Sequence, residues 1–263
     1  MKAVILAAGR GTRMREPDPA ARLTPEQSAA ADRGAKAMMP IHGRPFLDHA
    51  LGALADAGVD DACLVVGPEH DEIGARYGGD TWRRPGVRIA VQERPLGSAD
   101  AVLAAEPFAA GEPFIVVNGD NLYPAAAVAA LLATPAPATL AFARAGLLRD
   151  GAIPAERIAA YAILDVDVEG IVRGVLEKPS AEVLARFGDD ARVSMNCWLF
   201  DARIFDACRA VPPSPRGELE LAGAVQVLID VLGARVRAVP VDASVLDLSR
   251  RGDVAVVESR LDA

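Results

Sequence analysis

The stretch that decides the fold is residues 1–14, MKAVILAAGRGTRM. Its apolar run KAVILAA is typical of a buried strand. Two glycines and two arginines follow within a few residues, and they predict a flexible, positively charged loop. We therefore interpret the opening of the chain as a buried strand that ends in a basic loop.

The same alternation continues outward from this stretch. Further apolar runs occur at 61–67, 87–92 and 113–119, and helix-compatible segments separate them at 45–58, 68–78 and 97–111. In the second half we expect more exposed strands at 159–167, 171–179 and 194–201, a helix at 218–233, strands at 235–242 and 244–249, and a terminal helix. This pattern predicts a three-layer, mostly parallel, doubly wound (Rossmann-like) α/β sheet with an extra β-rich portion.

Bulk composition limits the class of protein. The chain has 263 residues, of which 51% are hydrophobic and 24% charged, so it can bury a substantial core. With no convincing linker, we expect one domain over 1–263. Its three scattered cysteines suggest neither a disulfide framework nor a zinc site, and without a credible signal peptide they favour a reducing cytoplasm.

One segment imitates a membrane span, because residues 121–143 carry no charge. The segment is mostly alanine, and Pro135 and Pro137 interrupt it. We expect a short buried helix, a turn and the strand ATLAFA at 138–143, and no membrane partner.

Charge excludes nucleic acid as a partner. The net charge is −8, whereas residues 1–45 hold eight basic and four acidic side chains. Nucleic acids are bound mainly through basic side chains on phosphates, so an acidic protein repels them. A locally basic entrance suits a small polyanion.

The opening loop matches neither familiar phosphate motif. The dinucleotide pattern GxGxxG would need glycine where Met14 stands, and the P-loop pattern is absent from the chain. In sheets of this type ligands bind where strands end and helices begin. The loop is therefore a third kind of phosphate loop.

At LAAGRGTRM the sequence resembles the sugar-1-phosphate nucleotidyltransferases, also called nucleotide-sugar pyrophosphorylases. The resemblance continues in order through KAMMPIHGRPFLDHAL, QERPLGSADAV, VVNGD, EKP, MNCWLFD, RGELEL and VLDLS, over about 250 residues. It implies the nucleotide-diphospho-sugar transferase type of fold, with residues 1–120 mainly binding nucleotide and 121–263 mainly binding sugar phosphate and supplying a second metal ligand.

The resemblance also implies the reaction: a sugar 1-phosphate oxygen attacks the α-phosphorus of a nucleoside triphosphate and pyrophosphate leaves. A phosphate oxygen is already an anion, so the chemistry needs charge neutralisation and in-line positioning rather than a general base. The expected partners are a nucleoside triphosphate and a sugar 1-phosphate. Whether the chain forms a homo-oligomer is left open.

The opening loop is assigned to the nucleotide. Gly9 and Gly11 would let the backbone approach the triphosphate, Thr12 would donate to phosphate oxygens, and Arg13 offers a fork suited to the β- and γ-phosphates. The wall beside the base and ribose is assigned by resemblance to Leu6, Ala7 and Ala8.

Lysine is rare in this chain. Only Lys2, Lys36 and Lys178 occur among 28 basic residues, and two of the three stand inside the motifs above. A compact ammonium reaches a crowded phosphate as a point charge. By similarity, Lys36 would hold the triphosphate and Lys178 the sugar phosphate, and with Arg13 they are the expected catalytic residues.

A magnesium site is expected at the end of the strand FIVV. Asp120 follows this strand, between Asn118 and Asn121, and the resemblance supplies a second carboxylate, Asp247. Mg²⁺ prefers one or two carboxylates together with phosphate oxygens and waters. The alternative interpretation of NGD is a simple turn.

Base selection is assigned to Gln92, with Pro95, Gly97 and Ser98 following in the same segment. A glutamine amide can donate to a carbonyl and accept from a ring N–H, which complements uracil or thymine. Related enzymes that use GTP tend to have an acid here, so the resemblance favours UTP or dTTP.

The sugar-phosphate side is assigned by resemblance to Asn118, Glu177, Asn196 and Ala162. Ala162 departs from the family, which usually has glycine there, and its methyl group would crowd a sugar hydroxyl. The segment between Arg13 and Lys36 is longer than expected and is rich in proline, alanine and charge, which suggests either a mobile flap or a solvent loop without a role.

Three alternatives remain open. The chain could transfer a nucleotide to another phosphomonoester such as phosphocholine or inositol phosphate. It could be a catalytically silent relative that binds nucleotide sugars. A glycosyltransferase is disfavoured, because it would prefer an acidic pair where this chain has NGD.

Overall fold

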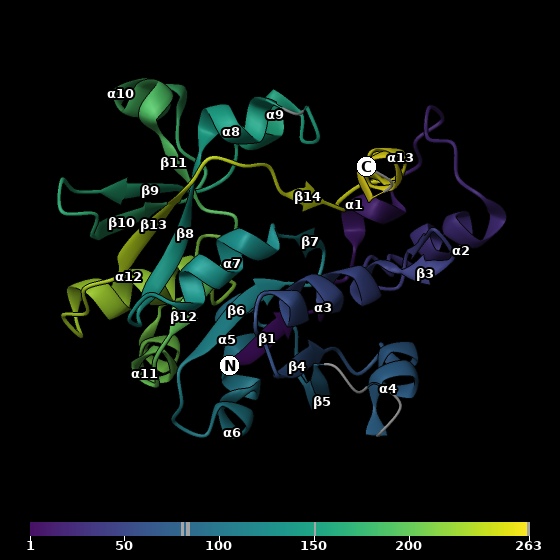
Figure 1. Cartoon of the computed structure of the whole chain (residues 1–263), viewed down its shortest axis with the longest axis horizontal. Helices are drawn as coiled ribbons and strands as arrows, with labels where there is room; N and C mark the ends of the chain where they lie inside the picture. The colour runs from purple at the N-terminus through teal and green to yellow at the C-terminus, as the bar shows by residue number, and fades with distance from the viewer. Residues whose placement is uncertain (80–81, 83–84, 150, 262–263) are drawn as a thin grey trace.

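A ten-stranded sheet forms the centre of the computed structural model, which describes residues 1–79, 82, 85–149 and 151–261 (Figure 1). The strand order is β10-β9-β11-β8-β12-β6-β1-β4-β5, and β13 pairs with β8. The strands of this sheet are β1 (Lys2–Leu6), β4 (Asp61–Val66), β5 (Gly86–Val91), β6 (Phe114–Asn118), β8 (Ala138–Ala143), β9 (Ile163–Val166), β10 (Val172–Leu176), β11 (Arg192–Val193), β12 (Trp198–Phe200) and β13 (Arg237–Val241).

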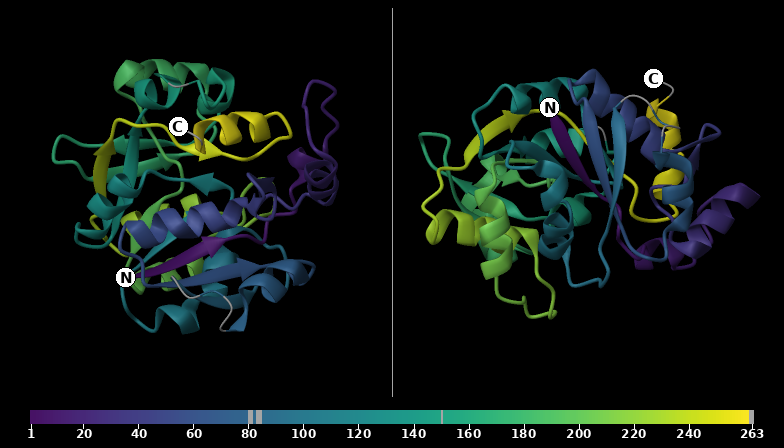
Figure 2. Two further views of the ribbon diagram at one scale, coloured as in Figure 1. Left: turned by 45° about the vertical axis from the view of Figure 1, so that its right-hand side comes forward. Right: turned by 90° about the horizontal axis from the view of Figure 1, so that it is seen from below.

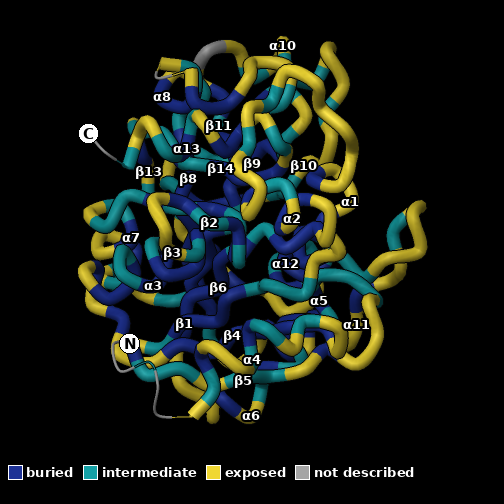
Figure 3. The backbone as a smooth tube through the Cα atoms, turned by 90° about the vertical axis from the view of Figure 1, so that its right-hand side faces the viewer, coloured by how far each residue is buried: buried dark blue, intermediate teal, exposed yellow. Residues whose placement is uncertain are grey.

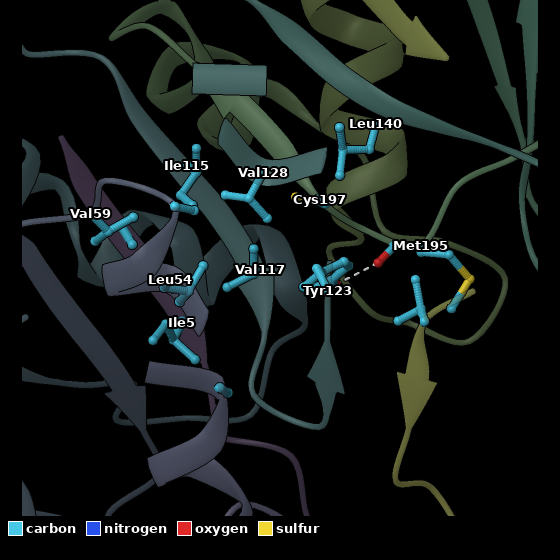
Figure 4. Packing of buried hydrophobic residues seen from close by; sticks show 14 of the residues in the cluster. Ile5, Leu54, Val59, Ile115, Val117, Tyr123, Val128, Leu140, Met195 and Cys197 are labelled. Carbon is cyan, nitrogen blue, oxygen red and sulfur yellow. Dashed lines mark hydrogen bonds between the residues drawn. The ribbon is translucent and has the colours of Figure 1, made fainter. Parts of the chain in front are cut away.

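Strand β1 shows why the sheet is covered on both faces. Its side chains alternate, so Val4 contributes to one hydrophobic core and Ile5 to the other. Both are fully buried, and β1 lies parallel to β4 and β6. A strand buried on both faces has a continuous apolar sequence, as KAVIL does. Figure 4 shows Ile5 among Leu54 and Val117 in the first core.

Helices form the two outer layers, and Figures 1 and 2 show them on either side of the sheet. The first core takes buried residues from α3, α4 and α7, and the second from α5, α6, α11 and α12. The helices are α1 (Thr12–Arg15), α2 (Pro25–Arg33), α3 (Phe46–Asp56), α4 (Asp71–Tyr77), α5 (Ser98–Ala104), α6 (Glu106–Ala109), α7 (Ala125–Leu132), α8 (Arg144–Arg149), α9 (Ala155–Ile158), α10 (Ala181–Phe187), α11 (Arg203–Ala210), α12 (Leu221–Asp230) and α13 (Asp253–Leu261), with a 3₁₀ turn at Gly188–Asp190.

The two halves of the sheet differ in strand direction. The neighbours β6, β1, β4 and β5 are all parallel. Beyond β6, the strands β12, β8, β11, β9 and β10 pair antiparallel, although β13 lies parallel to β8. The predicted doubly wound α/β fold with an extra β-rich portion is confirmed.

A third, small core joins the two ends of the chain. It contains Met14 from α1, Phe46 from α3, and Leu248 and Val254 from the C-terminal segment. Arg251 strengthens this junction, because its guanidinium donates to the carbonyls of residues 14, 15 and 16. Figure 1 accordingly shows α13 beside α1, and Figure 3 shows the buried backbone, in dark blue, running through β1, β4 and β6.

The long segment between Arg13 and Lys36 is not the uniform flap or loop that the sequence suggested, because its second half is helix α2. The helix begins with a capping box, in which the Thr24 hydroxyl accepts from the Gln27 amide and the Gln27 side chain accepts from the Thr24 amide. Gln27 also donates to Pro40 O and Glu258. Packing and these bonds hold α2 against the third core, so only the preceding stretch of 15–24 is largely exposed.

Two short two-stranded sheets complete the fold: β2 (Pro40–Ile41) with β3 (Arg44–Pro45), and β7 (Asn121–Leu122) with β14 (Leu246–Asp247). Among the helices of the described residues, none has both the length and the apolar character that crossing a bilayer requires. Segment 121–143 forms a short helix and a strand, as predicted.

Candidate active site

A cavity of about 480 Å³ lies at the carboxyl ends of the parallel strands. This is the edge at which doubly wound sheets bind their ligands. Twelve of the residues assigned from the sequence line it: Leu6, Ala7, Ala8, Gly9, Thr12, Lys36, Gln92, Pro95, Gly97, Ser98, Asn118 and Asp120.

The two glycines of the opening loop have different roles. A Cβ at Gly9 would meet no atom within 4 Å, so the space beside Gly9 at the cavity wall is open. A Cβ at Gly11 would lie 2.1 Å from Gly34 O, and Gly11 has a φ of +61°. Gly9 therefore leaves room for a ligand, whereas Gly11 is required by backbone packing against Gly34.

Lys36 and Asp120 form the charged centre of the cavity. The Lys36 ammonium donates to Asp120 Oδ2 at 2.9 Å. The Lys36 side chain is 16% exposed and that of Asp120 is 25% exposed, so both are partly shielded but reachable. The pair joins segments 84 residues apart, and it places a cation and a carboxylate side by side at the wall of the cavity.

The arginines of the opening loop are placed differently from one another. Arg10 lines the cavity, while Arg13 is exposed on α1 and lies outside its lining. Neither side chain forms a hydrogen bond or ion pair with any residue that the structure describes, so both guanidinium groups are available to an anion.

Gln92 follows β5 and is 6% exposed at the cavity wall. Its side-chain nitrogen donates to Gly97 O at 2.9 Å and to Asp100 Oδ2 at 2.8 Å. Both N–H groups of the amide are therefore occupied by the protein. The sequence interpretation gave this amide a donor and an acceptor for the base, but only its oxygen is left.

Asp247 is the last residue of β14, which pairs with β7, the strand that directly follows Asp120. Asp247 pairs with Asn121 across the β7–β14 ladder, and Leu248 N donates to Asp120 O at 2.8 Å. The predicted pair of carboxylates, 127 positions apart in sequence, therefore comes from neighbouring segments. Asp247 is 6% exposed and does not line the cavity.

The Asp247 carboxylate is held by its own partners. Arg157 Nη2 donates to Oδ2 at 2.5 Å, the Tyr161 hydroxyl donates to the same oxygen, and Ser249 donates to Oδ1 at 2.8 Å. Arg157 also pairs with Asp253 at 2.6 Å. Burial alone would lower the pKa of Arg157, but Asp247, together with Tyr161 and Asp253, outweighs burial and raises it.

The Asp120 carboxylate, which lines the first cavity, fits a hard divalent cation, whereas the Asp247 carboxylate is occupied by its own partners. Two carboxylates are the protein ligands that Mg²⁺ needs when phosphate oxygens and waters complete its shell. No cluster of three or more His, Cys, Asp or Glu side chains suited to a metal occurs within 1–79, 82, 85–149 and 151–261, so such an ion would depend on its substrate for ligands. A cation on Asp247 would have to compete with Arg157.

A second cavity, of about 640 Å³, is lined by two of the residues assigned to the acceptor, Glu177 and Lys178. Its charged lining residues are Glu177, Lys178, Arg216, Glu220 and Asp230. Lys178 forms no hydrogen bond or ion pair with any part of the chain that the structure describes, so its ammonium is available. Burial alone would raise the pKa of Glu220, but hydrogen bonds from Ser214 and Arg216, with the charges of Arg216 and Lys178, outweigh burial and lower it. Burial and the nearby Glu220 raise the pKa of Glu177.

The two cavities are neighbours, separated by one short segment. Glu218 lines the first cavity and Glu220 the second. Between them, Leu219 N donates to Leu96 O at 2.7 Å and Leu219 O accepts from Ala99 N at 2.9 Å. The wall between the cavities is thus attached to the segment that follows Gln92.

Two residues assigned to the sugar, Ala162 and Asn196, line neither cavity. Ala162 is 8% exposed, and its carbonyl accepts from Ser194 N at 2.8 Å. Asn196 has a left-handed backbone with φ +55° and lies just before β12. Their assignment to the sugar pocket therefore remains a prediction.

Comparison with known proteins decides the family. The sequence model described as nucleotidyl transferase matches residues 2–242. The chain belongs to the nucleotidyl transferase family. The family resemblance predicted from the motifs is confirmed.

Curated relatives of this chain are named for reactions on glucose 1-phosphate. It is 30% identical to a glucose-1-phosphate thymidylyltransferase of Streptomyces antibioticus, over 98% of this chain and 65% of that protein. It is 29% identical to the UTP–glucose-1-phosphate uridylyltransferase AglF of Haloferax volcanii, over 99% of this chain and 96% of that protein. The chain spans 65% and 58% of the thymidylyltransferases of S. antibioticus and Streptomyces griseus.

Solved structures share the fold of this chain. A UDP-glucose pyrophosphorylase complexed with UDP-glucose superposes with a TM-score of 0.75 at 16% identity, covering 99% of this chain and 98% of the other. A UTP-bound enzyme from Acinetobacter baumannii gives a TM-score of 0.75 at 19% identity, covering 100% and 94%. At these identities the likeness shows the fold alone.

The sequence interpretation missed four residues that line the cavities or hold site residues in place: Arg10, Asp100, Arg157 and Arg216. Arg10 and Arg216 lie inside motifs that were already noted, so their charge was a usable signal. Asp100 is three residues after Gly97, the N-cap of α5, and a side chain at this position can reach back to the first residues of the helix. Arg157 offered no signal, because only the tertiary fold brings α9 to Asp247.

Proposed function

We propose that this nucleotidyl transferase moves a nucleotidyl group from UTP or dTTP to a sugar 1-phosphate. An oxygen of the sugar phosphate forms a bond to the α-phosphorus, and the bond between that phosphorus and the bridging oxygen to the β-phosphate breaks. The products are a nucleoside diphosphate sugar and pyrophosphate. The nucleophile is an anion before the reaction, so no proton has to be removed from it.

The observation that supports this proposal best is the Lys36–Asp120 pair in the first cavity. A half-buried lysine at a strand-end cavity attracts phosphate, and a carboxylate beside it can hold a cation that the phosphates share. Gly9 leaves open space at the same wall. A triphosphate is the ligand that would use all three features together.

The second cavity provides a place for the acceptor. Lys178 and Arg216 both line it, and because Arg216 already pairs with Glu220 at 2.8 Å, the Lys178 ammonium is the charge that best suits the phosphate of a sugar 1-phosphate. The linings of the two cavities come together at residues 218–220, because Glu218 lines the first and Glu220 the second. Two anionic substrates held in neighbouring cavities would need to be positioned in line for the transfer.

The remaining roles follow the family resemblance. Arg13, Lys36 and Lys178 would neutralise charge on the reacting phosphates; Leu6, Ala7 and Ala8 would flank the base and ribose; and Asn118, Ala162, Glu177 and Asn196 would contact the sugar. Asp120 and Asp247 would hold Mg²⁺. Bound there, a Mg²⁺ ion would supply positive charge to the triphosphate. The chain's own residues would orient both substrates and exclude water.

The names of the relatives support the choice of substrates. Relatives from S. antibioticus and H. volcanii are named for thymidylyl and uridylyl transfer to glucose 1-phosphate. Both use pyrimidines with a ring N–H, which suits a glutamine oxygen. Glucose 1-phosphate is therefore the first acceptor to test, even though Ala162 predicts more crowding near a sugar hydroxyl.

Three further expectations belong to this proposal. Residues 1–120 would mainly bind nucleotide and residues 121–263 mainly the acceptor, as the linings of the two cavities suggest. The three buried, free cysteines are compatible with a reducing cytoplasm. A homo-oligomer is a hypothesis that light scattering of the purified protein would test.

A panel of triphosphates against phosphorylated acceptors tests the function. We expect pyrophosphate release with UTP or dTTP and a sugar 1-phosphate, in the presence of Mg²⁺, and loss of release in Lys36→Met. Release with phosphocholine or inositol phosphate instead would establish the alternative transferase. Tight binding of a nucleotide sugar without any release would support the silent relative.

A further inference from the structure

The side chain of Gln92 is almost completely buried, yet it belongs to the cavity wall. It directly follows β5, and its backbone N–H donates to Val66 O at 2.8 Å, which continues the ladder between β4 and β5. The residue is therefore held by the sheet. What its amide presents to a ligand depends on which end faces the protein.

The protein contacts of the amide fix that choice. Its nitrogen lies 2.9 Å from Gly97 O and 2.8 Å from Asp100 Oδ2. A carbonyl and a carboxylate both accept hydrogen bonds and donate none. If the amide turned over, its oxygen would lie against two other oxygens with no hydrogen between them. The two acceptors therefore set the orientation of the amide.

Both acceptors stand on a rigid frame. Gly97 has a φ of +126°, and a Cβ there would lie 2.4 Å from Leu219 O, so the backbone at this point is tightly packed. Asp100 lies in the first turn of α5, whose Ala99 and Val102 are fully buried in the second core. Neither acceptor can move away from Gln92 without disturbing this packing.

One polar atom of the side chain remains for a ligand, the oxygen Oε1. No residue within the described part of the chain donates a hydrogen bond to it. An amide oxygen accepts, so its partner must be a donor. Uracil and thymine present an N3–H, whereas the ring nitrogens at the corresponding edges of cytosine and adenine accept. An acceptor facing an acceptor leaves both groups unsatisfied in a buried site.

We propose that Asp100 is a specificity-determining positioning residue, which fixes the Gln92 amide with its oxygen toward the base and so selects a base with a ring N–H. This inference rests on the proposed nucleotide site. It assigns Asp100 no contact with substrate. The residue acts only through Gln92, and it changes which base is accepted rather than how phosphate is transferred.

UTP and CTP form the sharpest pair of probes, because they share the ribose, the triphosphate and the ring size. We would measure the dissociation constants of both by titration calorimetry with Mg²⁺, in the wild type and in Asp100→Leu. Losing one charge-assisted hydrogen bond on the amide lets it turn over. We expect the preference for UTP over CTP to fall by about 10-fold.

Asp206→Leu is the matched control. Asp206 is also an acid in the first turn of a helix, α11, with a side chain that is 72% exposed, and it lines neither cavity. The preference for UTP should be unchanged in this variant. An unchanged preference in a folded Asp100→Leu protein would overturn the inference.

A second pair of variants keeps the test decisive if Asp100→Leu fails to fold. Gln92→Glu sets a carboxylate against Asp100 and Gly97 O, which disfavours binding of UTP. Adding Asp100→Asn to this variant supplies an amide NH₂ group that can donate a hydrogen bond to the new carboxylate. We expect the double variant to bind UTP at least about 10-fold more tightly than Gln92→Glu alone, and simple additivity of the two changes would contradict the proposed coupling.

These measurements separate the inference from the proposed function. Binding of UTP and CTP requires no turnover. A protein that discriminates through Asp100 but releases no pyrophosphate would refute the transferase proposal alone. A protein that releases pyrophosphate with an unaltered base preference in Asp100→Leu would refute the positioning role alone.

Discussion

The parallel and antiparallel halves of this molecule differ in how they gather functional residues. At the carboxyl ends of β1, β5 and β6, all assigned nucleotide residues except Gly11 and Arg13 line one cavity. In the β-rich half, Glu177 and Lys178 line a second cavity, whereas Ala162, Asn196 and Asp247 line neither.

Strand direction explains this difference. In a parallel sheet every carboxyl end lies at the same edge, so a motif that follows any strand is delivered to one place. Antiparallel neighbours end at opposite edges, so the position of a motif after its strand does not say where it goes. Local sequence therefore predicts the nucleotide side of the site better than the acceptor side.

The largest expected effect tests the Lys36–Asp120 pair, which lies in the cavity of the parallel half. Asp120→Asn removes the carboxylate beside Lys36 and the ligand expected for Mg²⁺, so pyrophosphate release should fall by about 1,000-fold. The fold should remain intact by circular dichroism, and Asp206→Asn should retain full activity. Full activity in Asp120→Asn would show that the chemistry is not centred on the first cavity.

The next effect tests the buried ion pairs of Arg157 in the β-rich half. Arg157→Met would leave the buried carboxylates of Asp247 and Asp253 without their shared cation, and we expect a loss of about 3 kcal/mol in the free energy of unfolding in urea. Arg149→Met removes an exposed ion pair with Asp242 and should cost less than about 1 kcal/mol. Equal costs would mean that burial does not strengthen the role of Arg157.

The glycines of the opening loop provide a paired test inside the parallel half. Gly11→Ala places a Cβ against Gly34 O at a positive φ and should destabilise the protein by about 2 kcal/mol. Gly9→Ala meets open space, so its stability should change by less than about 0.5 kcal/mol, while the KM for the triphosphate rises. An unchanged KM for the triphosphate in Gly9→Ala would show that the triphosphate does not bind against this loop.

The smallest effect concerns the acceptor side alone. Lys178→Met should raise the KM for the sugar 1-phosphate by about 10-fold and leave the affinity for UTP unchanged. Arg173→Met is the control, because Arg173 lies on the same strand, β10, but lines neither cavity. A weaker affinity for UTP in Lys178→Met would break the division of the chain into a nucleotide part and an acceptor part.

Particular residues show what the sequence could and could not predict. The run KAVIL predicted β1 correctly because continuous burial needs a continuous apolar pattern. Helix α2 was missed although Thr24, Pro25 and Gln27 form a recognisable helix start, since proline and charge suggested a loop instead. The local sequence therefore contained enough information to predict this helix.

Other parts of the site had no local signal. The partner of Asp247 is Arg157, from a four-residue helix whose position depends on the packing of the whole β-rich half. The free end of the Gln92 amide also depends on tertiary contacts, because the sequence shows an amide but not which of its atoms the protein uses. Pairings between distant segments set both features.

The structure of the complex with UTP and Mg²⁺ tests the central claim most directly. We expect the uracil N3–H within hydrogen-bonding distance of Gln92 Oε1, the triphosphate along Gly9 and Lys36, and the metal ion on Asp120. A nucleotide bound in the second cavity, or a triphosphate that leaves Lys36 paired only with Asp120, would contradict the account.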